Sequence, residues 1–114
     1  MIEDKLSTVY FSIPDSEGCF SVEEQKESYD EYENWYKIEH NQNDNIGKLF
    51  YIPGIMDLRA IENIDFYLNP VCEIQNIMNR KNVTKIEMLE PGEVYLSGNT
   101  WKINKTKPVK IKFA

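Results

Sequence analysis

The sequence predicts an α+β fold, in which two or three helices pack on one face of a mainly antiparallel sheet. Three observations lead to this prediction. Apolar residues alternate along the C-terminal third, they recur at helical spacing in the middle of the chain, and a helix-capping pattern stands near the N-terminus. The chain has 114 residues, which suits one compact domain over residues 1–114.

The first expected element is a strand over residues 7–13. Val9, Phe11 and Ile13 alternate with other residues and would line one face of a sheet. Residues 14–18 are Pro, Asp, Ser, Glu and Gly, a composition that favours a turn after this strand.

An acidic helix is expected next, from Val22 to Lys37 or Glu39. Ser21 and Glu24 have the spacing of a capping box, in which each side chain binds a free backbone amide of the first turn. One stripe of this helix would face the sheet, and it consists of Val22, Gln25, Tyr29, Tyr32 and Tyr36.

The middle of the chain predicts a strand followed by two helices. Residues 48–52 form a short apolar run that a Pro-Gly turn ends. Between residues 55 and 68 apolar residues recur every three or four positions, as in an amphipathic helix. The dipeptide Asn69-Pro70 would start a third helix over residues 71–81.

The C-terminal third predicts a β-meander. Alternating apolar residues are found over 85–88, 94–96, 100–104 and 109–113, with turn-forming residues between the runs. Trp101 and Ile103 would face the core, so that one face of the meander is buried and the other is solvated.

Several classes of protein are disfavoured by the sequence. No apolar run approaches the roughly 20 residues of a membrane-spanning helix, and the first residues lack the pattern of a secretory signal. Cys19 and Cys72 are far apart, so we expect two reduced thiols rather than a disulfide. We therefore expect a cytoplasmic protein without membrane contact.

No catalytic, cofactor or metal motif is found in the sequence. His40 is the only histidine, and because no nucleophile motif accompanies it we expect a polar residue at a helix end. One histidine and two distant cysteines do not make a zinc site, and residues 41–52 lack the leading aspartate and final glutamate of a calcium loop. We expect a protein that is not an enzyme and uses neither cofactor nor metal.

The charge is unevenly distributed. The net charge is −6, but residues 1–46 hold twelve acidic residues and three lysines, a net of −9, whereas residues 47–114 hold seven acidic and ten basic residues, a net of +3. An acidic half does not suit phosphate binding, but it suits docking on a basic protein surface. Solubility alone is the simpler alternative.

The expected helix carries one candidate contact surface. Acidic residues at helical spacing stand beside two apolar residues, and the candidate partner-binding residues are Glu23, Glu27, Asp30, Glu31, Trp35 and Ile38. An exposed tryptophan with a charged rim has the composition of an interface anchor. In the alternative interpretation, Trp35 and Ile38 pack under the C-terminal strands and the acidic residues form only a solvated face.

A cationic face on the meander is a second, weaker candidate for contact with nucleic acid or an acidic partner. Its residues are Lys85, Lys102, Lys110 and Lys112. Lysines on exposed and edge strands also protect sheets from aggregation, so nucleic-acid binding is not the favoured prediction.

Three classes of function remain open. The favoured one is a small non-enzymatic inhibitor or immunity-type protein whose acidic helix face covers a basic functional surface of a protein target, such as a nuclease or toxin. The alternative is a structural subunit of a phage particle or secretion-type assembly. The third is a small enzyme or ligand-binding domain.

Overall fold

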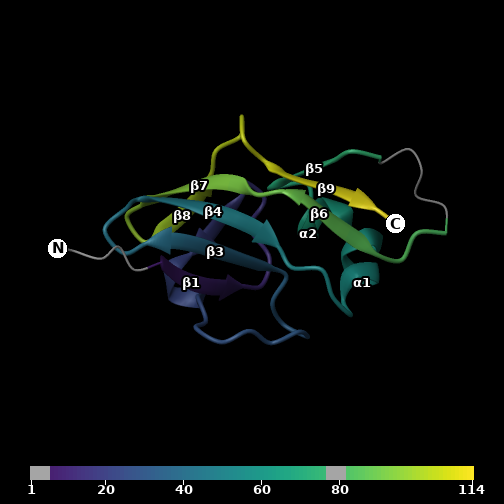
Figure 1. The fold of residues 1–114 in the computed structure, drawn as a ribbon, viewed down its shortest axis with the longest axis horizontal. Coiled ribbons are helices and arrows are strands. Elements are labelled where there is room, and N and C mark those ends of the chain that lie inside the picture. Colours follow the sequence, from purple (N-terminus) through teal and green to yellow (C-terminus); the bar gives the residue numbers. More distant parts are fainter. Residues whose placement is uncertain (1–5, 77–81) are drawn as a thin grey trace.

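The protein is built from two β-sheets and two short helices (Figure 1). The computed structural model describes residues 6–76 and 82–114. The larger sheet is antiparallel and has the strand order β1-β3-β4-β7-β8-β2, and the smaller sheet has the order β5-β9-β6. The predicted mainly antiparallel sheet is therefore confirmed, with a parallel pair between β5 and β9.

The larger sheet buries one face along its length. Its strands are β1 (Leu6–Phe11), β2 (Cys19–Ser21), β3 (Tyr36–Asn41), β4 (Ile46–Tyr51), β7 (Gly92–Ser97) and β8 (Thr100–Ile103). Inward-facing residues such as Val9 and Phe11 in β1 are buried, and the residues between them are more exposed, as the period of two requires. The strands predicted over 7–13 and 48–52 are confirmed as β1 and β4, with shifted ends.

The smaller sheet contains β5 (Cys72–Ile74), β6 (Ile86–Glu90) and β9 (Val109–Phe113). Only Pro91 separates β6 from β7, so this stretch of chain runs from one sheet into the other. β7 and β8 form the predicted hairpin, in which Gly98 takes the left-handed conformation at φ +62°. The predicted meander strands are present, but β9 leaves this hairpin to lie between β5 and β6.

The helices are shorter and fewer than expected. The helix predicted over 55–68 is two short helices, α1 (Asp57–Glu62) and α2 (Ile64–Tyr67), separated by Asn63 at φ −132° and ψ 49°. The helix predicted over 71–81 is wrong where the structure describes it, because Cys72–Ile74 is strand β5. Residues 77–81 lie outside the described residues.

The expected acidic helix is also wrong. Only Val22–Glu24 is helical, as a single 3₁₀ turn (η1), and Tyr36–Asn41 is strand β3. Ser21 makes no side-chain capping bond and belongs to β2. Tyr29 and Tyr32, which were expected in the core stripe, are 41% and 62% exposed.

The pairing of β3 explains why a strand forms here. Tyr36 and Ile38 are two residues apart and both are fully buried, and β3 lies between β1 and β4. His40 continues this inward row and does not end a helix, since its ring lies 4.9 Å from the ring of Trp101. Long-range pairing thus overrides the local spacing of the tyrosines, and like charges at i, i+4 weaken the helical alternative.

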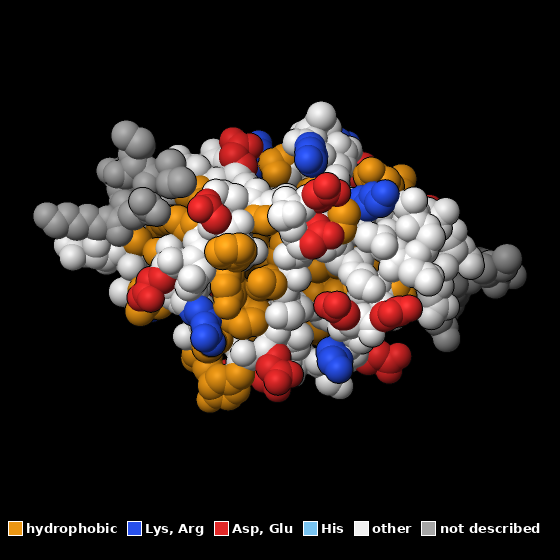
Figure 2. All heavy atoms as spheres, turned by 180° about the vertical axis from the view of Figure 1, so that it is seen from behind, with side chains coloured by type: hydrophobic (Ala, Val, Ile, Leu, Met, Phe, Trp, Pro, Cys, Tyr) orange, Lys and Arg blue, Asp and Glu red, His pale blue; other side chains and the backbone are white. Residues whose placement is uncertain are grey.

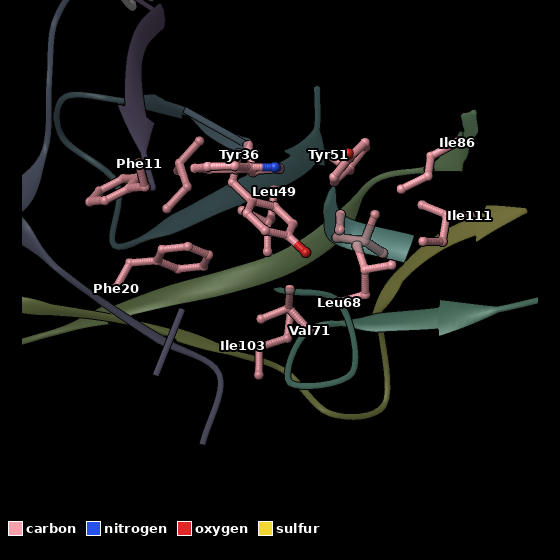
Figure 3. Close-up of a cluster of buried hydrophobic side chains, with 14 of the residues drawn as sticks. Phe11, Phe20, Tyr36, Leu49, Tyr51, Leu68, Val71, Ile86, Ile103 and Ile111 are labelled. Carbon is pink, nitrogen blue, oxygen red and sulfur yellow. The ribbon is translucent and has the colours of Figure 1, made fainter. Parts of the chain in front are cut away.

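The larger sheet curls so that its two edge strands approach each other across the core. The ring of Phe11 in β1 lies 5.0 Å from that of Phe20 in β2, although these strands are at opposite edges. Phe20 in turn packs 5.5 Å from Tyr36. Figure 3 shows that the core continues from this aromatic group toward Ile86 and Ile111 in the smaller sheet.

The predicted turn after β1 is confirmed. The Asp15 carboxylate accepts hydrogen bonds from the amides of Glu17 and Cys19, both at 2.9 Å. Gly18 has φ +82°, and a Cβ at this position would lie 2.4 Å from Ile103 and 2.6 Å from the carbonyl oxygen of Pro70. The turn therefore requires glycine here, because another side chain would be both strained and in collision.

Candidate protein-interaction surface

A strongly acidic part of the described surface is the segment that begins with the 3₁₀ turn η1 and continues without a helix or strand. We call residues 22–34 the acidic segment. It carries six exposed carboxylates, and they belong to Glu23, Glu24, Glu27, Asp30, Glu31 and Glu33. Lys26 is the one basic residue within these limits.

The acidic segment is attached to the sheet at three points. At its start, the amide of Val22 donates to the carbonyl oxygen of Asn99 at 2.8 Å. In its middle, Lys26 and Tyr10 exchange two backbone hydrogen bonds, of 2.8 and 2.9 Å, along the free edge of β1. Just after its end, the amide of Trp35 donates to the carbonyl oxygen of Phe11 at 3.1 Å. The segment therefore runs from β2 to β1, where these two edge strands of the curled sheet approach each other.

A closed turn orders the second half of the segment. The Asp30 amide donates to Oδ1 of Asn34 at 2.8 Å, and the Asn34 amide donates to the Asp30 carbonyl at 2.9 Å. The Asp30 carboxylate also accepts the Tyr32 amide at 2.9 Å. Since Asn34 is buried and makes these bonds, the exposed carboxylates are carried on a backbone with a defined conformation.

Trp35 and Ile38 are not part of this surface. Trp35 is 6% exposed and packs edge-on against Tyr67 at 5.0 Å, and Ile38 is fully buried in β3. The expectation that they are exposed for contact with a partner is therefore wrong. The alternative, that they belong to the core, agrees with their burial, although Trp35 packs on α2 rather than under the C-terminal strands. The structure thus separates them from Glu23, Glu27, Asp30 and Glu31, which are exposed.

A groove of about 390 Å³ lies beside the acidic segment. Its walls include Tyr10, Tyr29, Lys37, Phe50, Pro53 and Met88. Tyr29 comes from the acidic segment itself, and its ring lies 5.7 Å from that of Tyr10. This groove was not predicted from the sequence, although Tyr10 and Phe50 gave a signal for it. Both are large aromatic residues at positions where the alternation directs the side chain away from the core.

The charges around the groove are of both signs. Burial, followed by the charges of Glu31, Asp57 and Asp30, raises the pKa of the Tyr29 hydroxyl. Carboxylates of the acidic segment thus act on this wall of the groove. Lys37 is paired with Tyr10 on one neighbouring strand and with Phe50 on the other, and its Nζ lies 5.0 Å from the centre of the Phe50 ring and 3.2 Å from the carboxylate of Glu39. A cation already rests on the aromatic face of Phe50, with an acidic residue to balance it.

The expected cationic face is divided between the two sheets. Lys102 lies in β8 of the larger sheet, whereas Lys110 and Lys112 lie in β9 of the smaller one. Lys110 is 3.7 Å from Glu90, and Lys112 is 3.2 Å from Glu87. Lys85 is exposed just before β6. These ion pairs leave less free positive charge on the smaller sheet than the sequence suggested.

The buried reactive groups are engaged in structural contacts. The Asp57 carboxylate accepts three hydrogen bonds, from Tyr51, Gly54 and Ile86. Burial raises the pKa of the Cys72 thiol to about 12, so little of the nucleophilic thiolate exists near neutral pH. Cys19 and Cys72 are both free thiols, as expected.

The described residues contain neither a candidate metal site nor a membrane-spanning helix. Over 6–76 and 82–114, no cluster of three or more His, Cys, Asp or Glu side chains has an arrangement suited to a metal ion. Within the same ranges, no helix has both the length and the apolar character needed to cross a membrane.

Comparison with known proteins found no match for this chain. No family model, no curated protein sequence and no solved structure matches it.

Proposed function

We propose that this chain is a small non-enzymatic binding protein of the inhibitor or immunity type, which uses the acidic segment to cover a basic functional surface of a protein target such as a nuclease or toxin. One observation carries the proposal: six exposed carboxylates stand on a segment that is attached to the sheet at three points.

The anchoring matters because a partner then meets a preformed charge pattern. Little ordering entropy is lost on binding when the loop is already held by the hydrogen bonds of Lys26 and Asn34. A concentrated negative field also speeds the encounter with a basic surface. Tyr29 and Tyr32 supply exposed aromatic area between the carboxylates, and tyrosine is enriched among interface residues that contribute most to affinity.

A second candidate is a structural subunit of a larger assembly, such as a phage particle or secretion apparatus. Exposed apolar residues in and before the helices favour it, since Ile55, Leu58 and Phe66 are 58%, 45% and 70% exposed. Figure 2 shows further that apolar side chains gather over the middle of one face, with acidic side chains around them. Such surfaces are commonly covered in assemblies.

Charge reversal tests the first proposal. The variant Glu23→Lys, Glu27→Lys, Glu31→Lys changes three exposed side chains and leaves Asp30, which orders the turn, in place. We expect its association with a basic protein recovered from the native host to be at least about tenfold slower than that of the original chain, in stopped-flow or surface-binding measurements at low salt.

A matched variant controls for net charge. Asp44→Lys, Glu62→Lys, Glu73→Lys makes the same change of charge at exposed positions outside the acidic segment. Its association rate should stay close to that of the original chain. Equal rates for both triple variants would count against the acidic segment, and a salt-resistant oligomer of the chain alone in light scattering would favour the assembly subunit.

A further inference from the structure

The groove beside the acidic segment lies at a fork between strands β4 and β6. β4 pairs with β7 as far as the register Leu49↔Gly92, and β6 pairs with β9. Beyond Leu49 the chain of β4 has no strand pairing with β6. In Figure 1, β6 and β9 continue together toward one end of the molecule, and β4 stops before that end. The groove contains Phe50 and Pro53 from one branch of the fork and Met88 from the other.

At Met88, the edge of β6 that faces away from β9 has backbone groups available for pairing. Lys85 and Ala114 exchange two hydrogen bonds, of 3.1 and 2.9 Å. In an antiparallel ladder, hydrogen-bonded residue pairs alternate with pairs that are not hydrogen-bonded. The N–H and C=O groups of Glu87 therefore also face β9, whereas those of Ile86 and Met88 point away from it. The Ile86 amide confirms this direction, because it donates to Oδ2 of Asp57 at 3.1 Å. Within the described residues, no comparable side-chain bond is found at Met88.

The side-chain chemistry of the groove selects for a basic occupant. Lys37 already lies on the ring of Phe50, but Tyr29 offers an aromatic face, which attracts the cations of arginine and lysine. The exposed carboxylates of Asp30 and Glu31 directly follow Tyr29 in the chain, and Lys37 is balanced by Glu39. A long basic side chain can place its aliphatic part against the rings and its charge near the carboxylates.

We infer that an extended segment of the basic partner adds as a strand to the free edge of β6 at Met88 and places an arginine or lysine side chain over Tyr29. This inference rests on the proposed function, because it assigns the acidic segment and the groove to the same partner. Strand addition obtains affinity from main-chain hydrogen bonds and specificity from pockets for alternate side chains.

A defined peptide tests the inference without the partner. The probe is a fluorescent seven-residue peptide in which arginine and valine alternate, measured by fluorescence anisotropy. We expect it to bind at least about tenfold more tightly than the same peptide with methylated backbone amides at alternate residues, which cannot form the ladder, or than a peptide of glutamate and valine. Equal affinity for the three peptides, or no binding of the arginine peptide, overturns the inference.

Proline substitution tests whether the added strand pairs with β6 at Met88. Met88→Pro removes an amide hydrogen that faces away from β9, a position at which an edge strand tolerates proline. We expect this variant to lose at least about tenfold in peptide affinity. Thr8→Pro is the matched control, because Thr8, like Tyr10 two residues later, faces the free edge of β1, but unlike Tyr10 it does not line the groove. Unchanged affinity of Met88→Pro contradicts strand addition.

Other outcomes separate the two proposals. If Met88→Pro does not fold, as judged by circular dichroism, the backbone-methylated peptide still decides the question on the original chain. If the basic partner binds Met88→Pro normally but loses affinity for the triple lysine variant, the proposed function stands and the strand addition fails. If the peptide binds as expected but the partner ignores the charge reversal, the proposed function fails.

Discussion

Asp57 links two strands of different sheets through one buried carboxylate. Oδ1 accepts the hydroxyl of Tyr51 at 2.7 Å and the amide of Gly54 at 3.0 Å, and Oδ2 accepts the amide of Ile86 at 3.1 Å. Tyr51 ends β4 and Ile86 begins β6, so this single side chain holds together the two branches of the fork. Burial, together with the hydrogen bond to Asp57, raises the pKa of Tyr51, which therefore remains a donor at neutral pH.

Asp57→Ala should lower the free energy of unfolding by about 3 kcal/mol or more, because it leaves three donors without an acceptor and hydrogen bonds to charged groups contribute most. Urea unfolding measures this loss. Asp44→Ala removes an exposed carboxylate from a turn and should change stability by less than about 0.5 kcal/mol. A loss of under about 1 kcal/mol for Asp57→Ala would show that the carboxylate does not hold the fork.

At the scale of single elements, the sequence predicts strands well where one face is buried. The alternation of Trp101 and Ile103, or of Val109 and Ile111, shows directly which residues lie in the core, and these residues are buried as expected. The local pattern is sufficient here because the period of two matches the burial of the finished sheet.

The helix predictions were wrong where the same residues fit both the spacing of a helix and the alternation of a strand. Tyr29, Tyr32 and Tyr36 fit a helical stripe, but only Tyr36 is buried, since it pairs with Phe11 and Tyr51 on its two neighbouring strands. Those partners are far away in the sequence, and no local spacing identifies them. The same reason limits the candidate site: the exposed carboxylates are predictable, but the groove requires Tyr29, Phe50 and Met88 to be brought together by the fold.

Strand β5 lies where the sequence predicted a helix, and a side chain extends its pairing with β9. Asn76 follows this strand, and its side-chain amide donates to the carbonyl oxygen of Phe113 and accepts the Phe113 amide, both at 2.8 Å. These two bonds continue the β5–β9 pairing beyond Ile74.

Asn76→Ala should therefore reduce the free energy of unfolding by about 1–3 kcal/mol, since it leaves both polar groups of Phe113 unpaired in a partly buried place. Thermal unfolding followed by circular dichroism measures the change. Gln75→Ala is the control at the neighbouring exposed position, where only the backbone amide is used, and should change stability little. Equal melting temperatures for the two variants would contradict the pairing role of Asn76.

At the scale of the whole molecule, three weakly acidic side chains with raised pKa values make stability sensitive to alkaline pH. Burial is the main cause that raises the pKa of Tyr36 and Tyr51 above the ordinary value of 10.0, and it raises that of Cys72 from 9.0 to about 12. The hydroxyl of Tyr36 also lies 3.3 Å from the sulfur of Cys72, so the two groups share one partly buried polar contact. All three are neutral in the folded state at neutral pH.

The folded protein should consequently lose stability as the pH rises above about 9. The unfolded chain releases these protons near the ordinary pKa values, whereas the folded chain retains them, so each group lowers the free energy of unfolding by about 1.4 kcal/mol per pH unit between its two pKa values. The contribution is complete below the unfolded pKa and disappears toward the folded one. Urea midpoints measured from pH 7 to 11 should be level at first and then fall steeply. Cys72→Ala should make that fall less steep and delay its start, because the group that titrates first is gone, whereas Tyr32→Phe, at an exposed hydroxyl, should leave the profile unchanged. A level profile up to pH 11 would mean that these groups ionise as easily inside the protein as in water.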